Sequence, residues 1–226
     1  QKGIKIDQDI DMKRIAEMAR SYQPGLLVVD RTVTGEYENY TTPEQEVPNE
    51  PLPFPWETCM TMGDSWSFVP NDNYKSSHKL VQLLVKIVSR GGNFLLNIGP
   101  GPDGDWDPVT YTRLQDIGKW MAVNGEGIYN SKPMIPYSTD NIYFTQTEDG
   151  NTIYAFYLSE TDAVSLPGQV ILKNVPATKG SKISLLGSTA KLKWRTEAGS
   201  TIIMVPASVA AKVKSNYVAV FKIEKG

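Results

Sequence analysis

The chain has 226 residues, of which 40% are hydrophobic and 21% charged, a mixture typical of a folded protein with a packed core. The 23 Lys and Arg against 25 Asp and Glu give a formal net charge of −2, and no block of like charges indicates a nucleic-acid partner. Apolar runs such as Phe94-Leu95-Leu96 are far shorter than the roughly 20 residues of a transmembrane helix. We therefore expect a chain that binds neither nucleic acid nor membrane.

The single cysteine and the single histidine narrow the possible chemistry. Cys59 has no partner for an internal disulfide or a cysteine-cluster metal site. His78, standing alone, leaves little room for histidine-based catalysis or zinc binding. If the protein is an enzyme, carboxylates are the expected catalytic groups.

The N-terminal segment predicts one helix followed by one strand. Asp9 or Asp11 can cap a helix that has apolar residues at helical spacing from Met12 onward and that ends at Pro24-Gly25. The apolar run 26–29 then predicts a strand buried on both faces, as in parallel sheets.

Strands and helices continue to alternate up to Asn124. Residues 56–62 predict a strand, 76–90 a helix, 93–98 a second apolar strand, and a further helix starts at Pro108. This alternation predicts parallel βα units. Only about three strands fit before Asn124, too few for the eight of a closed barrel, so we expect about half of a barrel.

After about Pro133 the pattern changes to short runs rich in Val, Ile, Tyr and Thr, separated by turn signals. Such runs predict an antiparallel β-sandwich. We therefore divide the chain into a barrel-like part, residues 1–133, and a sandwich, residues 134–226. Examples of the expected strands are Thr152 to Leu158, Gln169 to Lys173, Ile183 to Leu186, Thr201 to Val205 and Tyr217 to Ile223.

A long loop after the first strand carries the first group of candidate site residues. Residues 32–55 contain five prolines and no periodicity, and a loop of this length is usually functional or a linker. Between Arg31 and Glu46 it collects four glutamates and two tyrosines, just past the carboxyl end of a strand, where parallel α/β folds keep their sites. A solvated acidic loop is the alternative, because charged residues are mostly exposed.

A second group lies near the other two strands. Trp56-Glu57 and the stretch Ser65-Trp66-Ser67-Phe68 place aromatic rings beside carboxylates, the usual lining of a sugar site. Tryptophan also simply fills cores. Asn97 closes the strand NFLLN and is a third candidate, although a buried asparagine more often hydrogen-bonds a loop backbone.

Taken together, four stretches resemble the carboxyl-terminal half of the catalytic barrel of α-L-fucosidases of glycoside hydrolase family 29. They are VVDRTVTGEYENYTTPEQEVP, PWETCMTMGDSWSF, VSRGGNFLLNIGPGPDG and RLQDIGKWMAVNGEGIY. The resemblance implies a partial (β/α)8-type barrel followed by the family's C-terminal β-sandwich. It also implies a secreted or periplasmic, retaining exo-α-L-fucosidase that hydrolyses terminal α-L-fucosyl linkages of glycans and needs neither metal nor cofactor.

The resemblance also implies roles for particular residues. Glu44 matches the acid/base, Arg31 the substrate-site arginine and Trp66 the aromatic residue that packs on the sugar. Glu57 is a rival for the acid/base, and otherwise a residue that holds Arg31 or the backbone. The single His78 starts a polar helix and is expected at the surface, because the family's fucose-binding histidines should lie upstream.

The aspartate nucleophile of the family should also lie upstream of Gln1, since its motif is absent and residues 1–9 carry neither an initiator methionine nor a leader. We therefore expect this chain to lack the N-terminal half of the protein and to be inactive alone. The alternative is a carbohydrate-binding or structural module without catalytic activity. Such a module would bind glycans through aromatic side chains of the sandwich, where Trp194 is the only tryptophan.

Overall fold

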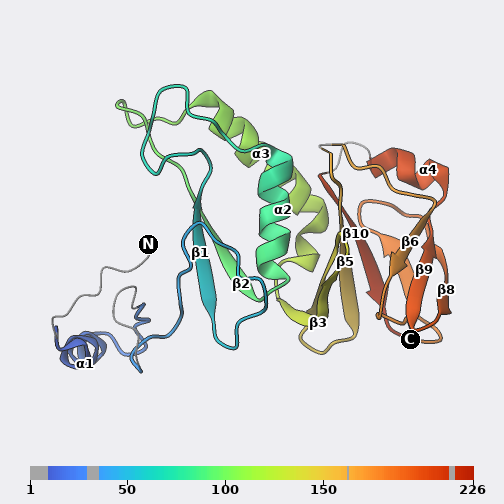
Figure 1. Ribbon diagram of the computed structural model, residues 1–226, viewed down its shortest axis with the longest axis horizontal. Helices are drawn as coiled ribbons and strands as arrows, with labels where there is room; N and C mark the ends of the chain where they lie inside the picture. The colour runs from blue at the N-terminus through green and yellow to red at the C-terminus, as the bar shows by residue number, and fades with distance from the viewer. Residues whose placement is uncertain (1–9, 30–35, 162, 214–216) are drawn as a thin grey trace.

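The computed structural model describes residues 10–29, 36–161, 163–213 and 217–226 (Figure 1). The first part of the chain alternates helices and strands, and the second part is built almost entirely of strands. The elements are, in chain order, α1 (Met12–Tyr22), β1 (Trp56–Thr61), α2 (Ser77–Val88), β2 (Gly92–Asn97), α3 (Pro108–Asn124), the short η1 (Gly125–Gly127), β3 (Ser131–Thr139), β4 (Ile142–Thr147), β5 (Thr152–Leu158), β6 (Gln169–Leu172), β7 (Lys182–Leu185), β8 (Lys193–Glu197), β9 (Ser200–Met204), α4 (Ala207–Ala210), the short η2 (Ala211–Val213) and β10 (Val218–Glu224).

Helix α1 forms as expected, but the strand predicted after it is wrong. Asp11 caps α1 by accepting the backbone N–H of Arg14, whereas Asp9 lies outside the described residues. Residues 26–29 make only one isolated parallel bridge, between Val29 and Tyr40, and Leu27 is 69% exposed. Asn39 bonds both backbone groups of Val28 at 2.9 Å, through its side-chain oxygen and its own N–H. These local bonds replace a strand ladder.

The two strands of the first part run parallel. β1 and β2 pair from Trp56 beside Gly92 to Thr61 beside Asn97, and α2 connects them, as in a βαβ unit. Helix α2 covers one face of this pair, where Leu83 and Ile87 pack against Trp56 and other side chains of both strands. Of the roughly three strands expected before Asn124, two form in the described residues.

The opposite face of the β1–β2 pair, called the open face below, is exposed along β2 in the described structure, although Cys59 and Thr61 of β1 are buried on it. Alternation along the strands puts Glu57, Cys59 and Thr61 of β1 on the face away from α2, together with their β2 partners. One of these partners, Leu95, is 51% exposed. An apolar side chain at the centre of a barrel-type sheet is normally covered.

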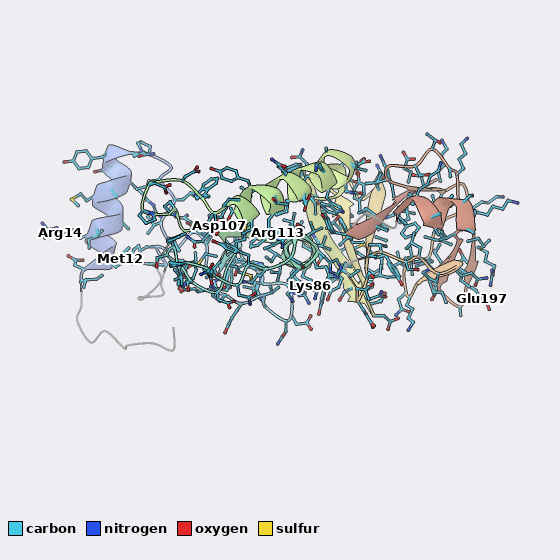
Figure 2. The ribbon with its side chains drawn as sticks, turned by 90° about the horizontal axis from the view of Figure 1, so that it is seen from above. Met12, Arg14, Lys86, Asp107, Arg113 and Glu197 are labelled. Carbon is cyan, nitrogen blue, oxygen red and sulfur yellow. The ribbon has the colours of Figure 1, made fainter. Side chains whose placement is uncertain are left out.

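Helices α2 and α3 join the first part to the β-sandwich. Val85 and Trp120 pack against Phe156 of β5 and Val220 of β10 in one buried cluster. The indole Nε1 of Trp120 donates to the Val218 carbonyl at 2.9 Å. Figure 2 shows the resulting order along the molecule, with Arg14 of α1 at one end and Glu197 of β8 at the other.

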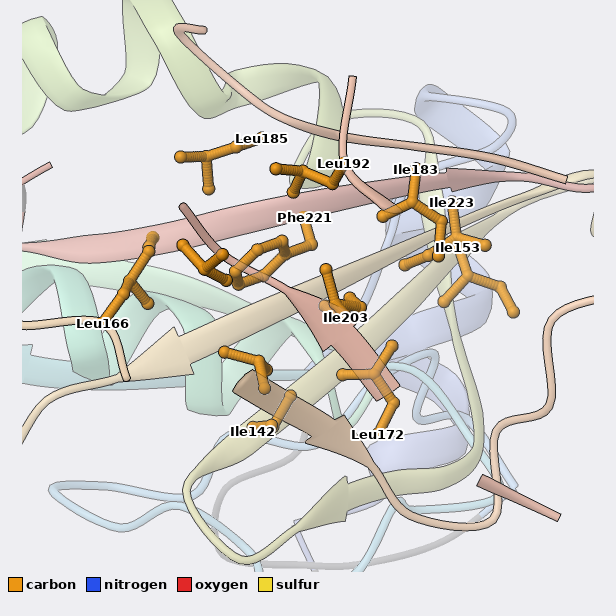
Figure 3. Close-up of a cluster of buried hydrophobic side chains, with 14 of the residues drawn as sticks. Ile142, Ile153, Leu166, Leu172, Ile183, Leu185, Leu192, Ile203, Phe221 and Ile223 are labelled. Atoms are coloured by element: carbon orange, nitrogen blue, oxygen red, sulfur yellow. The ribbon is translucent and has the colours of Figure 1, made fainter. Parts of the chain in front are cut away.

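The β-rich part consists of two antiparallel sheets around a common core, as expected. One sheet has the strand order β3-β4-β5-β10-β7 and the other β6-β9-β8. Phe221 and Ile153 of the first sheet meet Leu172 and Ile203 of the second in an apolar cluster (Figure 3). All five expected strand runs form, with ends within about one residue of the prediction.

The sandwich also contains three strands that were not among the examples named from the sequence, namely β3, β4 and β8. β3 contains Pro133 and Pro136 and shifts register between Pro133 and Ser138, which is tolerated because it is an edge strand. β8 has no fully buried residue and therefore shows little apolar alternation. Across the described ranges, no helix is long and apolar enough to cross a membrane.

The expectation that His78 lies at the surface is wrong. Its side chain is only 7% exposed, and its Nε2 lies 2.9 Å from Nε2 of Gln82 one turn later. Gln82 also donates to the Ser159 carbonyl at 2.6 Å. The segment after β5 therefore packs over the start of α2, a long-range contact that sequence spacing does not indicate.

Candidate active site

The candidate site lies at the carboxyl ends of β1 and β2. Because the strands are parallel, Thr61 and Asn97 end side by side, and the backbone N–H of Met62 donates to the Asn97 carbonyl at 2.9 Å. The loops that follow, residues 62–76 and 98–107, therefore leave the sheet from the same edge. Active sites of parallel α/β barrels are built at this edge.

Glu44 is held beside the second half of β1. Residues 41–46 run parallel to the free edge of β1, with bridges between Thr41 and Trp56 and between Glu44 and Cys59. The Gln45 N–H donates to the Cys59 carbonyl at 2.9 Å. Since bridged residues of parallel strands share a face, Glu44 lies on the open face, on the side of Thr61 rather than Trp56.

Glu57 occupies the other end of the same strand. It is the second residue of β1, two residues and about 7 Å before Cys59. Its β2 partner is Asn93, and both line a cavity of about 340 Å³ with Tyr40 and Leu27. Both glutamates thus lie on the open face of the sheet, but Glu44 lies nearer its carboxyl edge.

Trp66 lies in the loop after β1 and is 42% exposed, so it does not fill a core. The loop is held by Asp72, whose carboxylate accepts the backbone N–H groups of Asp64 and Ser65, each at 3.2 Å. Lys75 Nζ donates to the carbonyls of Thr61 and Gly63 at 2.7 and 3.0 Å. These contacts fix the backbone that presents the Trp66 ring.

Asn97 is the last residue of β2, and its Oδ1 is buried with no hydrogen-bond partner within the described part of the chain. A buried unpaired amide oxygen costs about 1–3 kcal/mol. This contrasts with the usual structural asparagine, whose side chain bonds a loop backbone. Asn97 shares the open face with its partner Thr61.

The remaining sequence-predicted site residue, Arg31, lies outside the described residues. In the described part of its loop, which resumes at Glu36, Arg20 of α1 donates to the Tyr37 carbonyl at 2.9 Å and to Asn39 Oδ1 at 2.7 Å. The hydrogen bond with Glu36 raises the pKa of Tyr37 to about 12.

Three contributors to this edge were not singled out from the sequence. Gln45 follows Glu44 with a backbone φ of 57° and bonds the side chain of Thr61. Nothing in the sequence distinguishes Lys75 from an ordinary surface lysine. Trp106 lies in the loop after β2, where the turn cluster Gly99 to Gly104 marked a loop without indicating a site.

The surroundings of Trp194 and the arrangement of possible metal ligands bear on two other kinds of site. Trp194 is half-buried, and its Nε1 donates to the Ser181 carbonyl at 3.2 Å, so its ring is part of the sandwich rather than an open binding surface. Among the residues that the structure describes, no group of three or more His, Cys, Asp or Glu could hold a metal ion.

Comparison with known proteins identifies the sequence pattern. The family model described as Alpha-L-fucosidase matches residues 2–126, and the one described as Alpha-L-fucosidase C-terminal domain matches residues 136–224. An alpha-L-fucosidase of Branchiostoma floridae is 31% identical over 193 residues, covering 82% of this chain and 42% of that protein. The tissue alpha-L-fucosidase of Mus musculus is 37% identical over 144 residues, covering 62% of this chain and 31% of that protein.

Solved structures show the same architecture. Alpha-L-fucosidase isoenzyme 1 from Paenibacillus thiaminolyticus matches with a TM-score of 0.79 and 24% identity, over 93% of this chain and 52% of that one. The Thermotoga maritima alpha-fucosidase in complex with fucose matches with a TM-score of 0.77 and 22% identity, over 94% of this chain and 48% of that one. The fold is therefore a partial (β/α)8-type barrel followed by an antiparallel β-sandwich. The chain spans about half the length of these structures and less than half of the two sequence relatives.

Proposed function

Because the chain belongs to the alpha-L-fucosidase family, we propose that it supplies the acid/base half of a retaining exo-α-L-fucosidase that removes terminal α-L-fucosyl groups from glycans. The position of Glu44 on the open face, beside the carboxyl half of β1, carries this proposal. A covalent intermediate has been trapped in a Bacteroides thetaiotaomicron alpha-L-fucosidase that matches this chain with a TM-score of 0.74. A covalent intermediate is the mark of a retaining mechanism.

Glu44 is preferred to Glu57 as the acid/base on geometry. Loops at the carboxyl edge of a barrel approach the substrate from outside, where the leaving oxygen lies. Glu44 belongs to such a segment, whereas Glu57 is fixed within β1 and its backbone N–H donates to the Thr41 carbonyl at 2.9 Å. Glu57 is then a residue that orients neighbouring groups on the sheet face.

In the proposed reaction, protonated Glu44 gives its proton to the glycosidic oxygen as the bond between that oxygen and the anomeric carbon breaks. An aspartate from a part of the protein outside these 226 residues attacks the anomeric carbon and forms a fucosyl ester. The Glu44 carboxylate then removes a proton from water, which attacks the same carbon and releases fucose with retained configuration. The two carboxylates must lie about 5–5.5 Å apart.

Trp66 and Arg31 are proposed to bind the sugar. The exposed Trp66 ring can cover the apolar side of fucose and its methyl group, a contact that aromatic side chains make well. In the sequence, Arg31 comes two residues after Val29, which bridges Tyr40, and lies close to the start of the loop that carries Glu44. We assign it to the sugar or the nucleophile, because pairing with Glu44 would favour the ionised form of that acid.

The open face is the reason to expect that a further part of the protein covers it and completes the site. Leu95 is half-exposed and the Asn97 Oδ1 is unpaired in the described structure, and the chain covers 42% or less of the two sequence relatives. We propose that the N-terminal half of the barrel covers this face and that the chain alone is inactive. We also propose a boundary between the parts after Pro133, and a secreted or periplasmic location, in line with a human relative named plasma alpha-L-fucosidase.

The proposal is tested with glutamate variants of the complete protein. Glu44→Ala should slow natural fucosides far more than aryl fucosides with a good leaving group, because only the former need a proton. Azide should restore turnover and give a fucosyl azide of retained configuration. If Glu57→Ala shows this rescue and Glu44→Ala does not, Glu57 is the acid/base. If the complete protein releases no fucose from either substrate class, the proposed activity is wrong.

A further inference from the structure

The loop between β1 and α2, residues 62–76 and called the Trp66 loop below, is closed at its base by Lys75. The Lys75 Nζ donates to the Thr61 carbonyl at 2.7 Å and to the Gly63 carbonyl at 3.0 Å. The backbone N–H of Lys75 donates to the Met62 carbonyl between them at 2.9 Å. One residue thus binds three consecutive carbonyls at the point where the chain leaves β1. An ammonium suits this position, because it is a compact charge with three donors.

Lys75 is itself fixed by the two helices of the first part. Arg113 of α3 donates from Nε to the Lys75 carbonyl at 3.0 Å (Figure 2). The residue after Lys75 is Ser76, the cap of α2, whose Oγ accepts the Lys79 N–H at 3.1 Å. The ammonium therefore extends from a backbone that is anchored to α2 and α3, and it holds the base of the Trp66 loop against that anchor.

The far part of the Trp66 loop rests on the loop that follows β2. A side chain at Gly99 would come within 2.5 Å of the backbone nitrogen of Phe68, so the two backbones are in contact there. Trp66 lies between this contact and the base at Lys75. Its ring is 42% exposed and has few packing contacts of its own. The direction of the ring therefore depends mainly on the backbone of the loop.

The two carbonyls that share the ammonium differ in how firmly they are held. Thr61 belongs to β1 and is paired with Asn97 of β2, so it stays in place without Lys75. Gly63 lies beyond the strand, and its carbonyl accepts one further bond, from Thr61 Oγ1 at 2.6 Å. Loss of the ammonium should therefore loosen the Gly63 side, which leads to Trp66, and leave the sheet intact.

We infer that Lys75 is a positioning residue for the sugar, acting through Trp66, an inference that rests on the proposed function. With the ammonium in place, the Trp66 face is ordered before the sugar arrives, and binding does not have to pay for ordering it. Without it, the ring occupies several positions, and part of the contact with fucose is lost to ordering. Acid assistance by Glu44 is not involved, because Glu44 is held along β1 through Gln45.

The test replaces Lys75 in the complete protein. Lys75→Met keeps an unbranched side chain and removes the ammonium. We expect the Kd for fucose, measured by titration calorimetry, to rise about tenfold, within the range of one aromatic contact. The values of kcat/KM for natural fucosides and for aryl fucosides should fall by similar factors, because proton donation is unchanged. Lys79→Met is the control, since it removes the same charge from an exposed position four residues later.

A double-mutant cycle distinguishes positioning from a general effect on the fold. In a Trp66→Ala background, Lys75→Met should change the Kd for fucose by less than about twofold, because the ring that Lys75 positions is absent. A second variant, Lys75→Ala, lacks three methylene groups and the ammonium. Propylammonium supplies these atoms and should restore fucose affinity in Lys75→Ala, whereas tetramethylammonium, which has no N–H donor, should not.

The possible results separate this inference from the proposed function. An equal loss of affinity with and without the Trp66 ring would overturn the inference, and so would an unchanged Kd in Lys75→Met, while the fucosidase activity would stand in both cases. Lys75 variants that do not fold, even with propylammonium, would show that Lys75 serves stability and would overturn it too. If the unaltered protein neither binds fucose nor hydrolyses a fucoside, the proposed function fails and this inference fails with it.

Discussion

Gln45 and Thr61 are joined by two hydrogen bonds between the loop that carries Glu44 and the end of β1. The Gln45 side-chain amide donates to Thr61 Oγ1 at 3.1 Å, and its carbonyl oxygen accepts the Thr61 backbone N–H at 3.4 Å. Thr61 Oγ1 in turn donates to the Gly63 carbonyl at 2.6 Å. This chain of bonds links the position of Glu44 to the loop that presents Trp66.

Gln45→Ala should therefore displace Glu44 without removing it. In the complete protein we expect kcat/KM for natural fucosides to fall by about 10–100-fold, the cost of a catalytic group misplaced by roughly 1 Å. Aryl fucosides with good leaving groups should lose much less, because they need little acid assistance. Glu46→Ala, one residue further along, is the control and should leave both rates unchanged. Equal losses for both substrates would contradict a positioning role.

Trp66→Ala should weaken fucose binding by about 1–3 kcal/mol, because it removes one aromatic face from the sugar. The unfolding temperature should change little, since the ring is 42% exposed. Titration calorimetry with fucose and thermal unfolding measure the two effects. Val69→Ala, in the same loop and 41% exposed, is the control. A large loss of stability with unchanged fucose affinity would place Trp66 in the core instead.

Gly92→Ala should destabilise the protein by about 1–3 kcal/mol through overpacking. A side chain at Gly92 would overlap the indole ring of Trp56, which is 1% exposed and donates from Nε1 to the Arg90 carbonyl at 3.2 Å. Gly118→Ala is the matched control, because nothing lies within 4 Å of its added carbon and helix propensity should make it neutral or stabilising. Denaturant unfolding of both variants measures the difference, and similar stabilities would refute the argument.

Ser77→Ala should lower stability in a pH-dependent way. Ser77 Oγ donates to Asp116 Oδ2 at 2.8 Å, and this bond is the main reason that the pKa of Asp116 lies below its usual range. A pKa lowered by folding contributes stability that is complete above the carboxyl's unfolded pKa of about 3.9 and is lost as the pH falls through the folded value. We expect a deficit of about 0.5–1.5 kcal/mol at neutral pH, shrinking in acid.

The control for this pH dependence is the neighbouring serine. Ser76 caps α2 by accepting the Lys79 N–H at 3.1 Å, and Ser76→Ala should cost about 1 kcal/mol. Because no carboxylate is described at this cap, that deficit should stay constant over the same acidic range. Unfolding free energies measured from neutral pH to about pH 3 compare the two variants. If the Ser77→Ala deficit also stays constant over this pH range, the lowered pKa of Asp116 does not contribute to stability and the prediction is wrong.

Periodicity located most elements of this fold. Helix α2 has apolar residues at helical spacing, and β2 is a short apolar run between glycine and turn signals, so each pattern had one interpretation. The run 26–29 looked equally clear, but a strand also needs partners for its backbone groups. In the described structure Asn39 supplies the partners of Val28 instead.

The sequence by itself determined the family, the alternation of barrel elements, the change to a sandwich and the residue types of the site, because these follow from local spacing and from motifs such as NFLLNIGPGPDG. Only the tertiary structure decided that Glu44 lies beside Cys59, that Gln45 bonds Thr61, that His78 is buried and that Phe68 and Trp106 share a cavity. Each of these pairings joins residues distant in the chain or depends on which neighbour covers a face. Such contacts are set by the global packing of the chain, and the local pattern of the sequence does not carry them.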